Sequence, residues 1–301
     1  MSDFKAFLSE LDNRGIKYVR EYELCGASTF KIGGKATVAV IPENCDDLVF
    51  AIDKGYEYKK KLHVLGRGSN TLFSDDGYDG ILILTKGLCS IADKGEGILE
   101  CSAGASLGAV SAFAADRSLS GFEFASGIPG SIGGAMFMNA GAYGSAMSDF
   151  VIDSLAYDLE KKKTVTIREH EFGYRKSIYS RDRRLICLSV RIKLHEGNCE
   201  EIKEKIRALA AERRSKQPIE YPSGGSYFKR PEGYFAGKLI EDCGLKGLSV
   251  GGAEVSEKHA GFIINKGGAT SCDVLKLEEK IRKAVYERFH VLLEREVEYV
   301  D

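Results

Sequence analysis

The chain has 301 residues, with 43 Lys or Arg and 44 Asp or Glu, so its formal net charge is −1. This balance argues against a nucleic-acid-binding protein, which would present a strongly basic surface. The share of hydrophobic residues is 44%, no apolar run is long enough to cross a bilayer, and the N-terminus lacks a signal-peptide core. We therefore expect a globular, cytoplasmic protein with no membrane partner.

Eight cysteines are scattered through the sequence without any C-x-x-C spacing. Cys101 and Cys187 lie in apolar, strand-like runs, which favours reduced, buried thiols. The five histidines do not cluster near cysteine pairs, so we expect no metal site.

The N-terminal region begins with an amphipathic helix, because the apolar residues of 2–14 follow helical spacing. The sequence then predicts a strand at 37–41 and a helix at 46–53 after an Asn44 cap. The pair Gly33–Gly34 is read as a turn or as a close approach to a ligand, with the turn favoured.

A predicted strand at 63–65 leads directly into a run of small residues, Gly66, Arg67, Gly68, Ser69 and Asn70. Such a run can form a nest of backbone N–H groups that holds an anion, or it can be a hairpin loop. The G-x-G-x-x-G spacing of a Rossmann turn is absent, and no amphipathic helix follows directly.

The segment 121–150 combines six glycines between positions 127 and 144 with interleaved apolar residues such as Ile128 and Met136. We expect it to be buried and not helical, because glycine is a poor helix former. A buried segment that is mostly backbone needs hydrogen-bond partners, and a large polar ligand with phosphates could supply them.

The rest of the chain alternates strands and helices. Predicted strands lie at 81–84, 98–102, 151–157, 163–167, 185–194, 262–264 and 291–300. Predicted helices lie at 107–115, 199–215, 235–242 and 272–289, and the charged helix 199–215 is typical of a connector between domains.

Three polar positions are candidates for chemistry, and each has a structural alternative. Ser226 lies in a glycine-rich loop and can serve as a proton donor or as a turn serine, with the turn favoured. Arg175 can clamp a carboxylate or phosphate, or form a surface ion pair. Glu294, Glu296 and Glu298 share one face of the last predicted strand, and periodicity does not single out one of them.

Six motifs occur in a fixed order along the chain: Ile32-Gly33-Gly34, LGRGSN (65–70), EFASGIPGSIGGAMFMNAGAYG (123–144), GYRKS (173–177), GGSYFKRP (224–231) and LEREV (293–297). In this order they resemble the UDP-N-acetylenolpyruvoylglucosamine reductase family. The resemblance spans nearly the whole chain, which makes it more specific than any single glycine pattern. It implies an NADPH-dependent flavoenzyme that reduces UDP-N-acetylglucosamine enolpyruvate to UDP-N-acetylmuramate in peptidoglycan synthesis.

The resemblance also implies an α+β fold, namely the FAD-binding fold of the vanillyl-alcohol-oxidase (PCMH) type, with a separate α+β substrate-binding domain. Residues 1–60, completed by 291–301, and residues 61–204 would form the two FAD subdomains, and 205–290 the substrate domain. Non-covalent FAD would be held by Gly66, Arg67, Gly68, Ser69, Asn70, Gly127, Ile128, Pro129, Gly130, Ser131, Gly133, Gly134, Asn139, Ala140 and Gly141.

The family's catalytic residues correspond to Arg175, Ser226 and Glu296. Hydride from reduced flavin N5 would reach C3 of the enol ether, and Ser226 would deliver a proton to C2. Arg175 and Glu296 would stabilise the negative charge that develops on the substrate carboxylate. Tyr143, Lys216, Lys229 and Arg230 would contact the substrate.

The sequence departs from the family's pattern in two places. Arg230 stands where many members have asparagine, and Gly261 where asparagine is also common. The short segment 179–216 resembles the subclass that lacks a tyrosine-bearing loop over the substrate. We expect a monomer. The alternatives are another FAD-dependent sugar or alcohol oxidase or dehydrogenase of the same fold, and a nucleotide-binding module without catalysis.

Overall fold

The computed structural model describes residues 2–301 and confirms most predicted helices to within a few residues. Helix boundaries follow capping groups: the Asn44 side chain accepts the Asp47 N–H, and the Thr270 side chain accepts the Asp273 N–H. The helices are α1 (Ser2–Arg14), α2 (Cys45–Glu57), α3 (Leu107–Ala115), α4 (Ile132–Met138), α5 (Ile178–Arg181), α6 (Cys199–Lys216), α7 (Ala236–Asp242) and α8 (Ser271–Phe289).

The described chain forms two compact units. The first contains residues 2–19, 38–67 and 80–212, and the second contains residues 20–37, 68–79 and 213–301. The division falls within α6, between Glu212 and Arg213, in the charged helix that the sequence marked as a connector.

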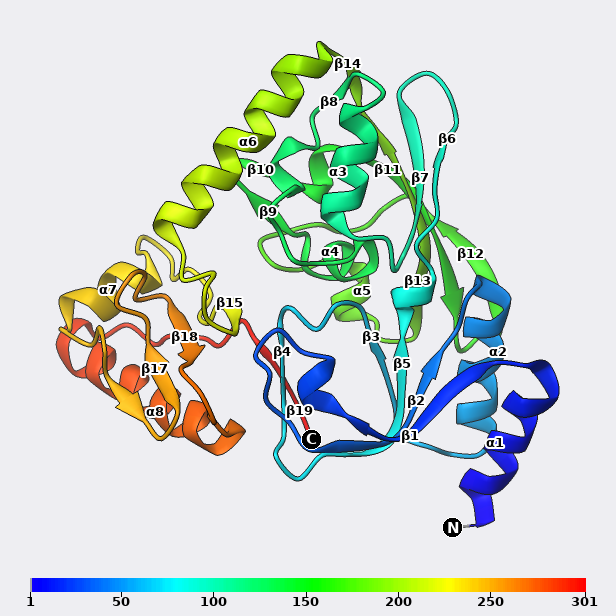
Figure 1. The fold of residues 1–301 in the computed structure, drawn as a ribbon, viewed down its shortest axis with the longest axis horizontal. Coiled ribbons are helices and arrows are strands. Elements are labelled where there is room, and N and C mark those ends of the chain that lie inside the picture. Colours follow the sequence, from blue (N-terminus) through cyan, green and yellow to red (C-terminus); the bar gives the residue numbers. More distant parts are fainter. Residues whose placement is uncertain (1) are drawn as a thin grey trace. The chain divides into compact units, whose positions relative to one another are not determined.

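A five-stranded antiparallel sheet dominates the first unit (Figure 1). Its order is β12 (Lys163–Ile167), β11 (Val151–Asp158), β13 (Leu185–Lys193), β7 (Ile98–Ser102) and β6 (Ile91–Asp93). A turn at 159–162 joins β11 to β12. Two short antiparallel pairs complete this part, β8 (Leu119–Ser120) with β14 (His195–Glu196) and β9 (Gly141–Ala142) with β10 (Ser145–Ala146).

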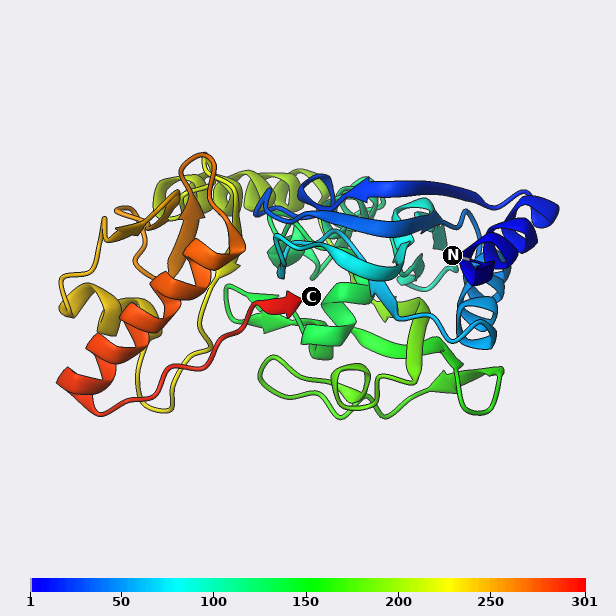
Figure 2. The same cartoon turned by 90° about the horizontal axis from the view of Figure 1, so that it is seen from below.

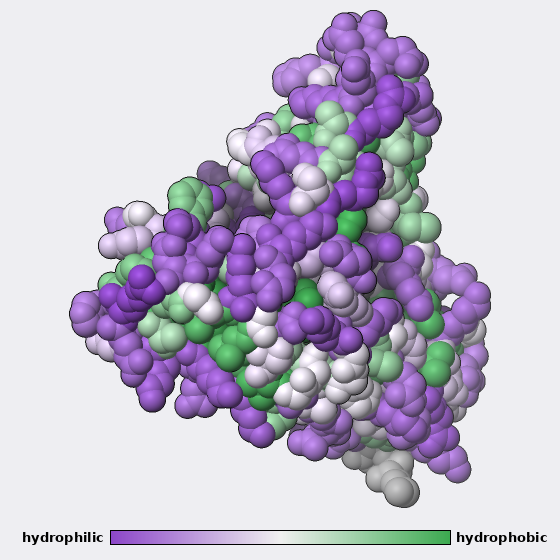
Figure 3. Space-filling view, turned by 60° about the vertical axis from the view of Figure 1, so that its left-hand side comes forward, coloured by the Kyte–Doolittle hydropathy of each residue, from purple (hydrophilic) through white to green (hydrophobic). Residues whose placement is uncertain are grey.

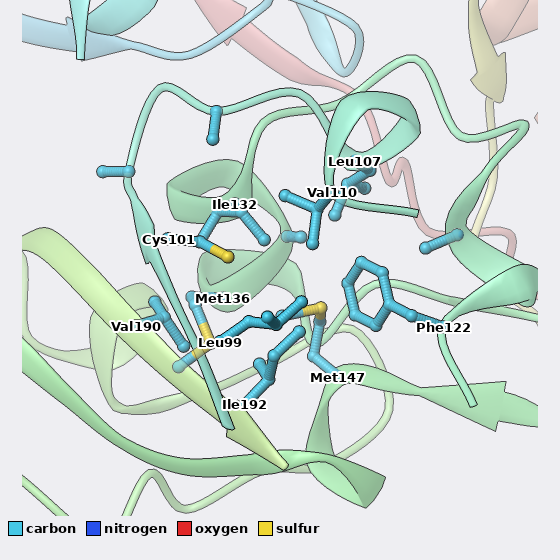
Figure 4. Packing of buried hydrophobic residues seen from close by; sticks show 14 of the residues in the cluster. Leu99, Cys101, Leu107, Val110, Phe122, Ile132, Met136, Met147, Val190 and Ile192 are labelled. Carbon is cyan, nitrogen blue, oxygen red and sulfur yellow. The ribbon is translucent and has the colours of Figure 1, made fainter. Parts of the chain in front are cut away.

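Helices α3 and α4 pack on the five-stranded sheet. Leu107 and Val110 of α3 and Ile132 and Met136 of α4 meet strand residues such as Val190 in one buried cluster (Figure 4). Burial of this apolar surface is the main term that holds the glycine-rich segment in place. The cluster therefore fixes α4 and the loop in front of it against the sheet.

A second sheet has the order β1 (Lys17–Glu23), β2 (Lys35–Ile41), β5 (Tyr78–Leu84), β3 (Leu62–Leu65). The paired residues of β3 and β5, which run parallel, all lie in the first unit. Helices α1 and α2 share a buried cluster with β2, β3 and β5 that includes Phe7, Leu48 and Ile83.

The second unit has its own sheet and core. The sheet order is β15 (Ser223–Ser226), β18 (Phe262–Asn265), β17 (Ala253–Val255), β16 (Ser249–Val250), all antiparallel. Helix α8 lies along this sheet, and its Val274, Leu277 and Ile281 belong to the unit's buried cluster (Figure 2). The last strand, β19 (Glu298–Val300), pairs in parallel with β4 (Thr71–Phe73).

Three expectations about local structure were wrong. The glycine-rich segment does contain a helix, α4, because Ser131 caps it and Ile132, Ala135 and Met136 supply a buried face. The last strand covers only Glu298–Val300, and before it only Arg295 forms an isolated bridge, to Phe228.

The third concerns Gly33–Gly34, which does not form the favoured turn. The Gly34 N–H donates to the Ser74 carbonyl, and its carbonyl accepts the Leu24 N–H. A Cβ at Gly34 would lie 2.3 Å from the Asp75 carbonyl oxygen. The glycines are required because two stretches of backbone pass very close to each other.

The cysteines behave as predicted where the fold buries them. Cys101 and Cys187 are buried free thiols, and burial raises the pKa of each to about 12. Cys89 and Cys272 are exposed, and all eight cysteines are free thiols in residues 2–301.

The face shown in Figure 3 is mostly hydrophilic, with apolar patches between the hydrophilic residues. Large exposed apolar side chains include Phe235, Tyr234 and Leu292 of the second unit. None of the helices formed by residues 2–301 combines the length and apolar character that crossing a bilayer requires.

Candidate active site

The first unit brings two of the predicted FAD-binding segments side by side. β3 ends at Leu65, and a Cβ at Gly66 would lie 2.3 Å from the Ser131 hydroxyl oxygen and 4.0 Å from the Gly134 nitrogen. Only glycine allows this approach. Ser131 is buried, caps α4 and forms a bridge with Ser106, so the loop that precedes α4 is held from both sides.

The loop at 127–134 fits the chemistry of a flavin nucleotide. Ile128 packs on the core cluster, while Gly127 and Gly130 are half-buried and Gly134 is exposed, so the segment offers backbone at the surface beside apolar side chains. A Cβ at Gly134 would have only the Ser131 oxygen nearby, at 3.5 Å. Glycine inside a helix lowers the stability of the folded protein, and no neighbouring atom is close enough to require glycine at position 134. A ligand that lies against the helix would explain it.

The remainder of the first loop, Gly68 to Asn70, belongs to the second unit. Gly68 has φ +61°, and a Cβ there would lie 2.0 Å from the Ala27 carbonyl oxygen. The Thr29 N–H donates to the Gly68 carbonyl at 3.1 Å. The loop backbone is thus fixed by its own unit, as a preorganised anion cradle requires.

Arg175 lies at the tip of a tight turn in the first unit. The Gly173 N–H donates to the Lys176 carbonyl at 3.0 Å, and the Lys176 N–H donates back to the Gly173 carbonyl at 3.3 Å. Arg175 has φ +53°, a conformation that non-glycine residues adopt at a cost. Its guanidinium lies 5.4 Å from the centre of the exposed Tyr174 ring. The turn therefore presents a cation in a defined, strained geometry.

Asn139 connects the glycine-rich segment to the turn of Arg175. It ends α4 with φ +42°, its side-chain amide donates to the Gly173 carbonyl at 3.1 Å, and its side-chain oxygen accepts the Ser148 N–H at 3.0 Å. A second link comes from the Ser177 hydroxyl, which donates to the Phe137 carbonyl at 3.1 Å. The sequence marked Asn139 as a flavin contact only and missed this role, because the partner lies 34 residues away.

In the second unit, the segments that carry Ser226 and Glu296 run beside each other. The Glu296 N–H donates to the carbonyl of Tyr227, the residue after Ser226, at 2.8 Å. The Asn70 side-chain amide donates to the Glu296 carbonyl at 3.1 Å. Ser226 ends β15 and is exposed, whereas Glu296 is half-buried. A hydroxyl, a carboxylic acid and the end of a predicted flavin loop thus gather in one unit.

The structure distinguishes the three glutamates that the sequence could not. Glu294 is 73% exposed and its carboxylate pairs with Lys229 at 3.1 Å. Glu298 belongs to β19, and its N–H donates to the Asn70 carbonyl. Of the three, only Glu296 donates its backbone N–H to the carbonyl of Tyr227, the residue after Ser226. This favours Glu296 as the acid near the serine.

The predicted substrate-binding residues are divided between the two units. In the first unit, Tyr143 has φ +54°, is 45% exposed and donates its hydroxyl to the Leu209 carbonyl of α6 at 3.2 Å. In the second unit, Lys216 is the exposed last residue of α6, and the Arg230 guanidinium lies 4.6 Å from the centre of the Phe235 ring.

Two protein-family models match parts of this chain. Residues 36–159 match the family described as FAD binding domain, and residues 217–300 match the C-terminal domain of UDP-N-acetylenolpyruvoylglucosamine reductase. A UDP-N-acetylenolpyruvoylglucosamine reductase from Caldanaerobacter subterraneus is 46% identical over 296 residues, covering 97% of this chain and 96% of that protein. The chain belongs to the UDP-N-acetylenolpyruvoylglucosamine reductase family. It is therefore an enzyme, an oxidoreductase, with an FAD-binding domain.

Further relatives agree with this family membership. The reductase of Geobacillus thermodenitrificans is 49% identical over 269 residues, covering 89% of this chain and 88% of that protein. The crystal structure of the reductase from Thermus caldophilus matches with a TM-score of 0.80 and 34% identity, covering 95% of this chain and 99% of that one.

The structure of the Physcomitrella patens protein BBE-like 1 matches with a TM-score of 0.52 and 15% identity, covering 63% of this chain and 44% of that one. This likeness shows a shared fold only. The α+β, FAD-binding fold of the vanillyl-alcohol-oxidase type is confirmed.

Proposed function

We propose that the protein catalyses the NADPH-dependent, FAD-mediated reduction of UDP-N-acetylglucosamine enolpyruvate to UDP-N-acetylmuramate, in the cytoplasmic synthesis of peptidoglycan precursors. The observation that carries the proposal is the backbone hydrogen bond from Glu296 to Tyr227, which puts the Glu296 segment beside Ser226. Relatives of matching length that bear the name of this reductase support the substrate.

We propose that FAD binds to the glycine loops at 66–70 and 127–141. When bound, FAD takes a hydride from NADPH and supplies it to C3 of the enolpyruvyl group. The glycines serve this binding by leaving backbone N–H groups accessible, since no Cβ covers them. Gly134 gives the strongest support, because it is exposed and the neighbouring atoms of the protein leave room for a Cβ, so the fold itself does not require glycine there.

The chain's own residues then act on the substrate carboxylate and on C2. As C3 gains a hydride, negative charge develops on the carboxylate, and the Arg175 guanidinium stabilises it as a preorganised cation. Glu296 stabilises the same charge as a hydrogen-bond donor when protonated. The Ser226 hydroxyl delivers its proton to C2. Lys229, three residues further on, lowers the free energy of the Ser226 alkoxide by its positive charge. The ion pair of Lys229 with Glu294 reduces that effect.

Tyr143, Lys216, Lys229 and Arg230 are proposed to contact the sugar and diphosphate, and residues 205–290 to form the substrate domain. Cations suit a diphosphate, because guanidinium and ammonium groups make charge-assisted hydrogen bonds to phosphate oxygens. The protein is proposed to act as a monomer.

Anaerobic mixing separates the two half-reactions. We expect NADPH to bleach the yellow protein and the enolpyruvyl substrate to restore the colour. Ser226→Ala should bleach normally with NADPH and reoxidise hardly at all. Equal loss of both steps would assign Ser226 a structural role, and bleaching by a simple sugar or alcohol would favour an oxidase or dehydrogenase of the same fold. A colourless preparation that releases no flavin on denaturation would refute the proposal.

A further inference from the structure

A buried carboxylate of α8 joins the two segments that carry Ser226 and Glu296. The Tyr227 hydroxyl donates to Glu278 Oε2 at 2.8 Å, and the Arg295 guanidinium lies 3.5 Å from the same oxygen. Tyr227 is fully buried, and Glu278 is 7% exposed. Tyr227 and Arg295 are thus the immediate chain neighbours of two proposed catalytic residues, Ser226 and Glu296.

The same two segments are also joined through their backbones. The Glu296 N–H donates to the Tyr227 carbonyl and the Lys229 N–H to the Glu294 carbonyl, each at 2.8 Å, and Phe228 forms a bridge with Arg295. Tyr227 is buried and reaches Glu278, whereas Ser226, one residue earlier, is exposed.

We propose that Glu278 is a positioning residue, which holds Ser226 and Glu296 in register through Tyr227 and Arg295. The inference rests on the proposed function, because it assigns Glu278 a role in presenting that reaction's proton donor and acid. The role proposed for Glu278 acts through its buried contacts with Tyr227 and Arg295 and requires no contact with the substrate or the flavin. Its carboxylate is the shared hydrogen-bond acceptor that fixes one backbone segment against the other.

The chemistry of the cluster suits this role. A buried hydroxyl that loses its acceptor is destabilised, and hydrogen bonds to a charged group are stronger than neutral ones. Burial, together with the neighbouring carboxylate, raises the pKa of Tyr227 well above its usual range, so the phenol stays a donor. Arg282, one turn further along α8, adds a second cation 3.8 Å from Glu278 Oε1. The Glu278 carboxylate thus contacts one hydroxyl donor and two cations, and it orders the Tyr227 and Arg295 side chains.

Close packing leaves the serine segment little freedom to adjust by other means. A Cβ at Gly224, two residues before Ser226, would lie 2.4 Å from the Phe30 ring and 3.1 Å from a Val297 methyl group. The Tyr227 ring packs edge-on against Phe30, with centroids 6.4 Å apart. A shift of Tyr227 would therefore move Ser226 as well.

Two substitutions in the full-length, FAD-loaded protein test the proposal. Tyr227→Phe removes the hydroxyl and keeps the ring, and Glu278→Gln keeps a hydrogen-bond acceptor and removes the charge. Glu279→Gln is the matched control, because Glu279 is the exposed neighbour on α8. We expect both test variants to slow reoxidation of the flavin by substrate by about 10- to 100-fold, the size of effect that sub-ångström to 1 Å displacements produce. Reduction by NADPH should be unchanged.

A second measurement does not depend on activity. Hydrogen exchange of the peptide that contains the Glu296 N–H should be faster in Glu278→Gln than in wild type, and unchanged in Glu279→Gln, because the bond to Tyr227 is weakened only in the first. Tyr227→Phe should add no further slowing in a Ser226→Ala background, if it acts through Ser226.

The possible outcomes separate the two proposals. Unchanged exchange at Glu296, or normal reoxidation in both test variants while Ser226→Ala is slow, would overturn the role of Glu278. Normal reoxidation in Ser226→Ala would overturn the proposed function, whereas faster exchange at Glu296 would still support the anchoring by Glu278.

Discussion

Replacing Gly134 with alanine should make the flavin-free protein more stable and the flavin-bound protein less stable. Gly134 is an exposed residue of α4, and a Cβ there meets nothing closer than the Ser131 oxygen at 3.5 Å, which is ordinary contact. Alanine in an exposed helix is favoured over glycine by about 0.5–1 kcal/mol, because glycine loses more conformational freedom on folding. The free energy of unfolding without FAD should rise by that amount.

The effect on FAD binding should have the opposite sign. If the flavin nucleotide lies against α4, a methyl group at 134 would occupy its place, and such overpacking typically costs about 1–3 kcal/mol. At about 1.4 kcal/mol for each factor of ten, the dissociation constant for FAD should rise by roughly 5- to 100-fold. Because the stabilisation by a ligand grows with the logarithm of its concentration relative to the dissociation constant, the gain in stability should be lost when FAD is in excess.

Urea denaturation with and without FAD, together with fluorescence titration of the flavin, would measure both effects. Gly133→Ala is the contrasting variant, because a Cβ there would lie 3.0 Å from the Ala103 Cβ and 3.2 Å from its carbonyl oxygen. We expect it to be destabilised with and without FAD. Wild-type FAD affinity in Gly134→Ala would refute the reasoning, since it would mean that the exposed face of α4 does not meet the flavin.

Three further predictions follow from the first unit. Asn139→Ala should lower the free energy of unfolding by about 2–4 kcal/mol in urea denaturation, because two hydrogen bonds are lost and alanine is strained at φ +42°; Asn139→Gly should recover only the strain. Gly66→Ala should release FAD, measured as the ratio of flavin to protein, because its Cβ would clash with the Ser131 oxygen. Burial lowers the pKa of His170 from 6.5, because it disfavours the charged imidazolium. The contribution of neutral His170 to the free energy of unfolding is therefore complete above pH 6.5 and is lost as the pH falls through the lowered pKa. Wild type should therefore lose more stability than His170→Asn on acidification.

Much of the secondary structure could be predicted, because its determinants are local. The strands β7 (Ile98–Ser102) and β12 (Lys163–Ile167) and the helix α3 (Leu107–Ala115) have the predicted bounds, since apolar periodicity and turn residues define them. Helix α4 was missed because its stability comes from the Ser131 cap and from packing on the sheet, and not from the propensities of its two glycines.

The candidate site depends on contacts that no local pattern reveals. The bond from Asn70 to Glu296 joins residues 226 positions apart, and the one from Tyr227 to Glu278 joins residues 51 apart. Periodicity grouped Glu296 with Glu294 and Glu298, and only the tertiary partners separate them. The motifs shared with the reductase family indicated Ser226, Arg175 and Glu296, because a family's motifs include residues whose contacts form only in the folded chain.

The places where local rules fail are informative about function. Asn139, Tyr143 and Arg175 all have positive φ, which costs an ordinary residue about 1–2 kcal/mol. Each is held by contacts from elsewhere: Asn139 by Gly173 and Ser148, Tyr143 by the Leu209 carbonyl, and the Arg175 turn by the Asn139 amide. These contacts fix a strained backbone, so the proposed binding of the substrate carboxylate by Arg175 would cost little further conformational freedom. Under the proposed function, Asn139 would connect flavin binding to charge stabilisation, and a change at Asn139 should disturb both.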